Sequence, residues 1–198
     1  MIVGHYATSL IPRSVLGDRC PYWLLLLCSQ IPEFLWLALA LIGVERPHPD
    51  SLLDATFGNL TVAMTYSHNL VPVLIQAAIV GALVWLLTRQ RDVAAWCAGL
   101  VVTHVLCDYV VGFEHQLLGS GSLAVGLNSY GRFPHLAILF ELAFSVALVF
   151  AYHRMEAQKG RGIDRRRRLL LYTLFIVGVG LWLPAATMPL RTLLSLVL

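Results

Sequence analysis

Five long apolar runs constrain the fold of this chain more than any other feature. A membrane-spanning helix needs about 20 mainly apolar residues, and five stretches approach this length: 22–44, 70–88, 93–113, 134–152 and 169–190. The chain is 58% hydrophobic and 13% charged, whereas soluble proteins are about 45–50% apolar and about 25% charged. We therefore expect an all-α, polytopic membrane bundle of about five transmembrane helices, in a single domain of residues 1–198.

The segments outside these runs suggest additional structure at the membrane surface. Residues 1–17 are too few for a span but apolar enough to enter the membrane as a re-entrant half-helix or to lie on its surface. After the first run, Pro47 and Pro49 break the chain, and residues 51–65 could form a short interfacial helix. The glycines of the 114–133 loop predict turns rather than a strand.

Positive charge orients the predicted spans. Basic residues flank the cytoplasmic ends of membrane helices, and here they gather in three segments: Arg13 to Arg19, Arg89 to Arg91, and 154–168. This pattern predicts a multi-pass protein of the cell inner (plasma) membrane with a cytoplasmic amino terminus and an external carboxyl terminus. The basic cluster at 159–168 flanks an apolar run, so it indicates contact with anionic membrane lipid and not a nucleic-acid partner.

A polar pair interrupts the third run. His104 and Asp108 are four residues apart, which places an imidazole and a carboxylate on one face of a helix. An ionisable side chain at membrane depth costs about 2.5–3.5 kcal/mol on insertion scales. Two such costly groups on one helix face are expected to serve a shared function, and their spacing suits a metal site or a proton relay.

Two further polar residues lie where they could meet this pair. Glu33 follows Pro32 in the first run, and a proline bends a helix and lets a neighbouring side chain turn inward. His68 enters at the outer mouth of the second run. A divalent metal would bind these imidazoles and carboxylates and compensate their charge. The spacing does not select zinc over manganese or iron, nor one ion over two.

Other polar residues near the outer ends are weaker candidates. His135 and Glu141 are six residues apart, which rotates a helix by about 240°, so at most one of them is expected to reach the site of His104. Glu114 and His115 are expected to be solvated loop residues at the edge of the third run.

Three short motifs carry a resemblance to a known family. In order, they are Pro32-Glu33, Tyr66-Ser67-His68-Asn69-Leu70 and Thr103-His104-Val105-Leu106-Cys107-Asp108. Together they resemble the YdjM-like family of bacterial inner-membrane proteins described as metal-dependent hydrolases, a group similar to zinc-dependent phospholipases C. In this chain Glu33 and Ser67 stand where the family carries aspartate and threonine. The resemblance implies zinc, hydrolysis of lipid-like phosphoesters, and a third site histidine at His5.

The leading hypothesis is therefore a membrane-embedded metal-dependent hydrolase. In it, Glu33 is the catalytic base or a further ligand, and the metal ligands are His68, His104, Asp108 and His5. A lipid-like substrate would enter from the outer leaflet and contact three residues near the second outer loop: Asn128, Tyr130 and His135. Two alternatives remain: a non-catalytic transporter, ion pathway or assembly subunit that uses the same polar residues, and a haem or quinone protein that uses the histidines.

Overall fold

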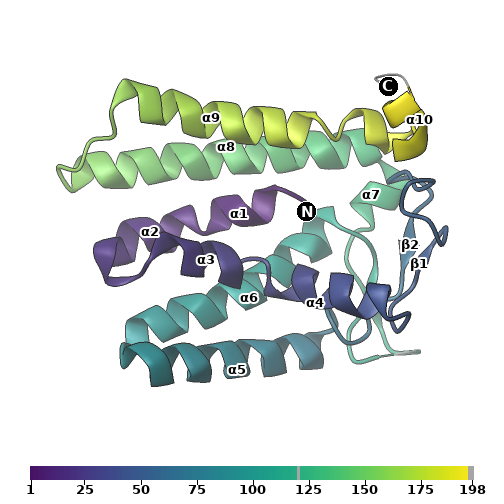
Figure 1. Ribbon diagram of the computed structural model, residues 1–198, viewed down its shortest axis with the longest axis horizontal. Helices are drawn as coiled ribbons and strands as arrows, with labels where there is room; N and C mark the ends of the chain where they lie inside the picture. Colours follow the sequence, from purple (N-terminus) through teal and green to yellow (C-terminus); the bar gives the residue numbers. More distant parts are fainter. Residues whose placement is uncertain (120, 196–198) are drawn as a thin grey trace.

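The structure, a computed structural model, describes residues 1–119 and 121–195 and confirms an all-α membrane bundle (Figure 1). Four helical stretches are long and apolar enough to cross a membrane. They are α5 (Leu70–Thr88), α6 (Arg91–Val111), α8 (Pro134–Gln158), and α9 (Arg165–Gly180) with the short 3₁₀ helix η2 (Pro184–Ala186) that follows it. Two shorter helices, α3 (Tyr22–Cys28) and α4 (Ile31–Leu41), meet at 55° and are together long and apolar enough for a fifth, broken span.

The bend in this fifth span lies next to Pro32, as predicted. Helix α3 ends at Cys28, and Pro32 occupies the second position of α4. Proline has no backbone N–H and is tolerated in the first turn of a helix, where that donor would have no partner. The chain therefore restarts as a new helix in a different direction.

The amino-terminal segment enters the bundle. Helices α1 (Gly4–Thr8) and α2 (Leu10–Leu16), followed by the 3₁₀ helix η1 (Gly17–Arg19), lie between the α8–α9 layer and the α5–α6 layer (Figure 1). Ala7 and Leu10 pack against Val149 of α8 and Phe175 of α9. The segment is therefore packed inside the bundle. Met1 accordingly lies in the interior, where its amine contacts Asp108.

The two ends of the bundle differ in composition. The α2–α3, α5–α6 and α8–α9 connections, which hold the basic segments, all lie at one end (left in Figure 1). The other end consists of loops with two antiparallel pairings, β1 (Pro47–His48) with β2 (Thr61–Val62) and β3 (His115–Gln116) with β4 (Ala124–Val125). Short helices α7 (Ser129–Arg132) and α10 (Leu190–Ser195) complete it. The basic segments that the sequence predicts to share one side of the membrane thus lie at one end of the bundle, and the loops predicted for the other side lie at the opposite end.

One expected element is absent from the described loops. Residues 51–65 form turns and the short strand β2, and no helix, so the predicted interfacial helix was wrong. The stretch contains Asp54, Gly58 and Asn59, residue types that favour turns over helix.

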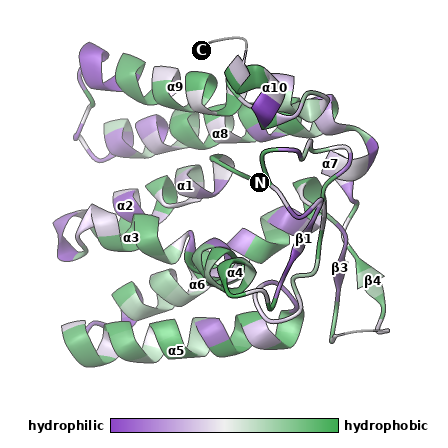
Figure 2. Cartoon of the chain, turned by 45° about the vertical axis from the view of Figure 1, so that its right-hand side comes forward, coloured by the Kyte–Doolittle hydropathy of each residue, from purple (hydrophilic) through white to green (hydrophobic). Residues whose placement is uncertain are grey.

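Hydrophobic residues make up most of the long helices, as the green colour in Figure 2 shows. Large exposed hydrophobic residues occur along every long helix; they include Leu74, Leu83, Leu106, Phe140, Phe150, Leu170 and Leu174. Soluble proteins rarely expose so much contiguous apolar surface. The surface is therefore suited to contact with lipid.

Candidate metal centre

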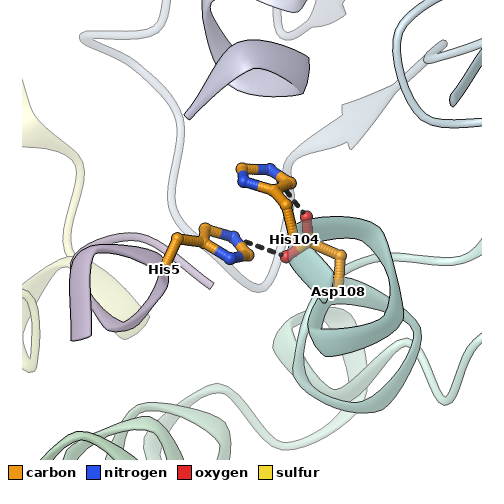
Figure 3. A group of neighbouring side chains, drawn as sticks. All are labelled: His5, His104 and Asp108. Atoms are coloured by element: carbon orange, nitrogen blue, oxygen red, sulfur yellow. Dashed lines mark hydrogen bonds and ion pairs between the residues drawn. The ribbon is translucent and has the colours of Figure 1, made fainter. Parts of the chain in front are cut away.

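His104 and Asp108 lie side by side on α6, as their spacing predicted. Nε2 of His104 is 3.3 Å from Oδ2 of Asp108, and both side chains are buried. Figure 3 shows the two residues on one face of the helix, with His5 approaching Asp108 from α1. This pair is the centre of a polar cluster inside an apolar bundle.

The bend between α3 and α4 orients the ring of His104. Nδ1 of His104 is 2.7 Å from the carbonyl oxygen of Ser29, a residue at the break between the two helices. A carbonyl oxygen only accepts hydrogen bonds, so Nδ1 carries the proton and Nε2 presents its lone pair. The same break that turns the first span thus sets the tautomer of His104.

The ring of His68, in the segment before α5, is also oriented by a hydrogen bond of its Nδ1. Its Nδ1 is 2.8 Å from Oγ of Ser67, whose hydroxyl donates to Oε2 of the buried Glu45 at 2.6 Å. Because that hydroxyl hydrogen points to Glu45, Oγ of Ser67 accepts a hydrogen bond from the Nδ1–H of His68. The Nε2 lone pair then faces Oδ2 of Asp108, 3.6 Å away. Glu45 could not be identified as a site residue from the sequence, because it lies in the loop that follows the first apolar run.

Glu33, in the first turn of α4, completes a possible ligand group. Its Oε2 is 3.9 Å from Nε2 of His68 and 3.9 Å from Nε2 of His104. Glu33, His68 and His104 together offer three ligand atoms within 4.8 Å of one another. The side chain of Glu33 keeps 33% of its surface exposed and lines a cavity over the cluster. The inward turn predicted from Pro32 is therefore present.

These positions fit a bound metal ion. Ligands at about 2.0–2.1 Å from a tetrahedral zinc lie roughly 3.3 Å apart, and the distances given above from Asp108 to His104 and His68 are close to this value. Nε2 of His68 and Nε2 of His104 are buried without a hydrogen-bond partner in the described residues. Such a buried polar atom costs about 1–3 kcal/mol. A cation bound here would satisfy both nitrogens.

His5 belongs to a second possible ligand group, with His104 and Asp108. Its Nε2 is 3.1 Å from Oδ1 of Asp108, and its ring stacks on that of His104, with centroids 3.5 Å apart and an interplanar angle of 13°. A ring nitrogen directs its lone pair within the ring plane, so one ion cannot lie in the planes of two stacked rings. The geometry therefore favours a role for His5 in orienting Asp108. It disfavours His5 as a ligand of the same ion as His104.

Glu141 of α8 holds the amino-terminal segment at the cluster. Its Oε2 accepts a hydrogen bond from the Tyr130 hydroxyl. Its Oε1 accepts hydrogen bonds of 2.7–2.9 Å from three consecutive backbone N–H groups, those of Ile2, Val3 and Gly4. N–H groups at the start of a helix have no partner within it, and a carboxylate satisfies them. His5 is thereby placed against Asp108.

His115 is a buried histidine that the sequence did not reveal. It was expected to be a solvated loop residue, but it is only 4% exposed and stacks on His68 with centroids 5.5 Å apart and an interplanar angle of 10°. Burial lowers the pKa of His115 to about 4, so its ring is neutral at pH 7. No sequence spacing connects position 115 with position 68, because the loop fold brings them together.

The three residues expected to contact substrate lie in different places. Tyr130 is buried and lines the cavity over the cluster. Asn128 does not line it, and His135 is exposed in the first turn of α8 and does not line it either. Of His135 and Glu141, only Glu141 lies beside the cluster. This agrees with the expectation that at most one of the two would reach the site of His104.

The cavity over the cluster has a volume of about 180 Å³. Its floor is polar and includes Glu33, His68, Asp108 and His115, and its walls are mostly apolar, with aromatic side chains from Trp36, Phe57, Phe113 and Trp182. A small polar group could therefore reach the cluster while an apolar part of the same molecule contacts the walls.

No protein-family model, curated protein or solved structure matches this chain. Its function must therefore be inferred from the geometry of the site.

Proposed function

We propose that the protein is a membrane-embedded, metal-dependent hydrolase of a lipid or lipid-linked phosphoester. The observation that carries the proposal is the pair of buried Nε2 atoms of His68 and His104, which lack hydrogen-bond partners and face the same oxygen of Asp108. Neutral imidazoles fixed by acceptors behind the ring are typical of metal ligands. In this proposal His68, His104 and Asp108 hold one divalent ion, and the mixed nitrogen and oxygen ligands favour zinc.

Glu33 is the proposed base. When bound, a divalent ion supplies Lewis-acid activation of water and of a phosphoryl oxygen. Glu33 faces the cavity and accepts one proton from the attacking water. The water oxygen forms a bond to phosphorus, the ester P–O bond breaks, and the proton passes from Glu33 to the oxygen of the departing alcohol.

The substrate class follows from the surroundings of the cluster. The cavity joins a polar floor to apolar walls within a bundle whose surface suits lipid, so an amphipathic molecule fits better than a small soluble one. The motifs around Glu33, His68 and His104 resemble those of the YdjM-like inner-membrane hydrolases, which supports the same substrate class. We place the site near the outer leaflet of the plasma membrane, at the end away from the basic connections.

The alternative functions have less support. An ion or proton pathway needs polar groups along the membrane, but residues 94–102 of α6, between the cluster and the basic end, contain no histidine and no acidic or basic side chain. A haem ligated by His68 or His104 would place its macrocycle against the carboxylate of Asp108. An enclosed metal site fits both observations better.

Metal content tests the proposed ligands. We expect about one divalent ion per chain in the detergent-purified protein and almost none in the His104→Ala, Asp108→Ala double variant, measured by inductively coupled plasma mass spectrometry. The matched control is His135→Ala, which removes an exposed histidine and should keep the ion. Equal, near-zero metal in all three proteins would contradict the proposal.

Hydrolysis tests the proposed base. The Glu33→Gln variant should keep metal bound by His68, His104 and Asp108 but cleave a chromogenic phosphodiester about 10²–10⁴-fold more slowly, the usual contribution of a general base. Wild-type rates in this variant would exclude Glu33 as the base.

A further inference from the structure

A second hollow lies beside the cavity, at the loop end of the molecule. It is a groove of about 480 Å³ between the β1–β2 and β3–β4 loops. Its polar lining comes from Arg46, His48, Thr61, Thr65, Asn69, Glu114, His115 and Gln116.

The groove and the cavity adjoin each other. Val62, Met64 and His115 line both. His115 also stacks on His68, so one layer of side chains separates the groove from the proposed metal ligands. A molecule whose reacting group lies on the cavity floor could therefore extend its polar part into the groove.

Asn69 is a buried polar residue of this groove. It occupies the N-cap position of α5, where an asparagine side chain commonly accepts a hydrogen bond from the first turn, but here it makes no such bond. It is only 3% exposed, and its Nδ2 has no hydrogen-bond partner in the described residues. A buried amide without partners is unfavourable in an isolated protein and becomes favourable when a ligand supplies them.

The charges of the groove indicate the kind of ligand. The formal charges of Arg46 and Glu114 offset each other, and the remaining polar side chains are amides, hydroxyls and imidazoles. A cationic headgroup would meet Arg46, and a multiply anionic one would meet Glu114. A neutral group with several hydroxyls can use the donors and acceptors together.

We propose that this groove binds the headgroup of the substrate and selects one that is rich in hydroxyls, such as a polyol or sugar. The inference rests on the proposed hydrolase function, because it assigns the cavity floor to the phosphoester and the groove to the group attached to it. Asn69, Arg46 and Gln116 are the selecting residues.

The test compares lipids that differ only in headgroup. Purified protein in detergent is offered an equimolar mixture of phosphatidylinositol, phosphatidylcholine and phosphatidic acid with identical acyl chains. Native mass spectrometry measures the lipid retained, and phosphate analysis measures hydrolysis. We expect phosphatidylinositol to be retained about tenfold over phosphatidylcholine, the effect of one or two hydrogen bonds.

The variants separate the groove from the metal site. Arg46→Ala with Gln116→Ala changes two exposed residues and should abolish this preference while metal content stays unchanged; Asn69→Ala should do the same. Gln158→Ala, at the basic end, is the matched control. A preference that survives in the variants, or equal retention of all lipids by the wild type, would overturn the proposal.

Two further outcomes keep the proposals distinct. Selective retention without hydrolysis of any lipid would contradict the hydrolase function but support the headgroup groove. Displacement of the lipid by soluble glycerophosphoinositol at equal concentration would overturn the assignment to a membrane lipid.

Discussion

At the scale of single residues, each of the two proposed histidine ligands is oriented by a different kind of group. His104 donates to a backbone carbonyl, that of Ser29, whereas His68 donates to Ser67, which is bonded to the carboxylate of Glu45. A carboxylate behind a histidine fixes the ring and increases its basicity. The orientation of His68 therefore depends on side chains, and that of His104 on the path of the backbone.

The role of His5 can be decided by metal binding. Because His5 contacts Asp108 and stacks on His104, we expect His5→Ala to weaken metal affinity about 10–100-fold, as loss of an outer-shell partner does, but to keep about one ion per chain at saturation. Titration against a competing chelator measures both quantities. His153→Ala, a change at the basic end of α8, is the control. If His5→Ala instead lost the ion as completely as we expect for the His104→Ala, Asp108→Ala double variant, His5 would be a ligand.

Helical spacing explains which site residues could be predicted. His104 and Asp108 share a helix, so the four-residue interval placed them together, and a proline next to Glu33 indicated its inward turn. Glu45 and His115 reach the cluster through loop segments, where the sequence carries no periodicity to place them. The side chains that orient His68 could therefore be identified only from the structure.

At the scale of elements, the entry of α1 into the bundle depends on its contact with α8. A Cβ atom on Gly4 would lie 2.9 Å from Cγ of Glu141, so that side chain would have to shift, and in a tight contact of 3.1 Å with Sδ of Met1. The absence of a side chain at position 4 thus allows the first turn of α1 to reach the Glu141 carboxylate.

This contact should contribute measurably to stability. In Glu141→Gln an uncharged amide replaces the carboxylate that accepts from three N–H groups and from Tyr130. We expect the free energy of unfolding to fall by about 1.5–3 kcal/mol, the range for hydrogen bonds to a charged group, as measured by denaturant unfolding in detergent. The matched control is Glu114→Gln, the same substitution at an exposed position. Equal stability of both variants would show that the contact has no net effect.

The long helices were predictable because the membrane imposes their length and composition. Four of the five apolar runs match single helical stretches, and the first matches the bent α3–α4 pair. The packing of α1 and α2 inside the bundle was only one of two options, because the residues that hold α1 there, such as Glu141, are more than 100 positions away in the chain. The strands of the loops were not predictable, because their pairings are too short to leave a recognisable pattern in the sequence.

At the scale of the whole molecule, the basic end should face the cytoplasm. We expect a membrane-impermeant maleimide to label Asp50→Cys in intact cells, and to label Arg89→Cys only after the membrane is disrupted. Both positions are exposed. The parent chain, in which three of the four free cysteines are buried, gives the background. The reverse labelling pattern would invert the proposed orientation and move the site to the inner leaflet.

The interior position of α1 also has a consequence for the order of assembly. Residues 2–4 precede α8 in the chain, but the carboxylate that holds them belongs to α8, whose Glu141 follows 137 positions after Gly4. The contact that places His5 beside Asp108 therefore cannot form until α8 has been synthesised. Helix α1 is made well before its partner on α8, so the centre is completed only after α8 has joined the bundle.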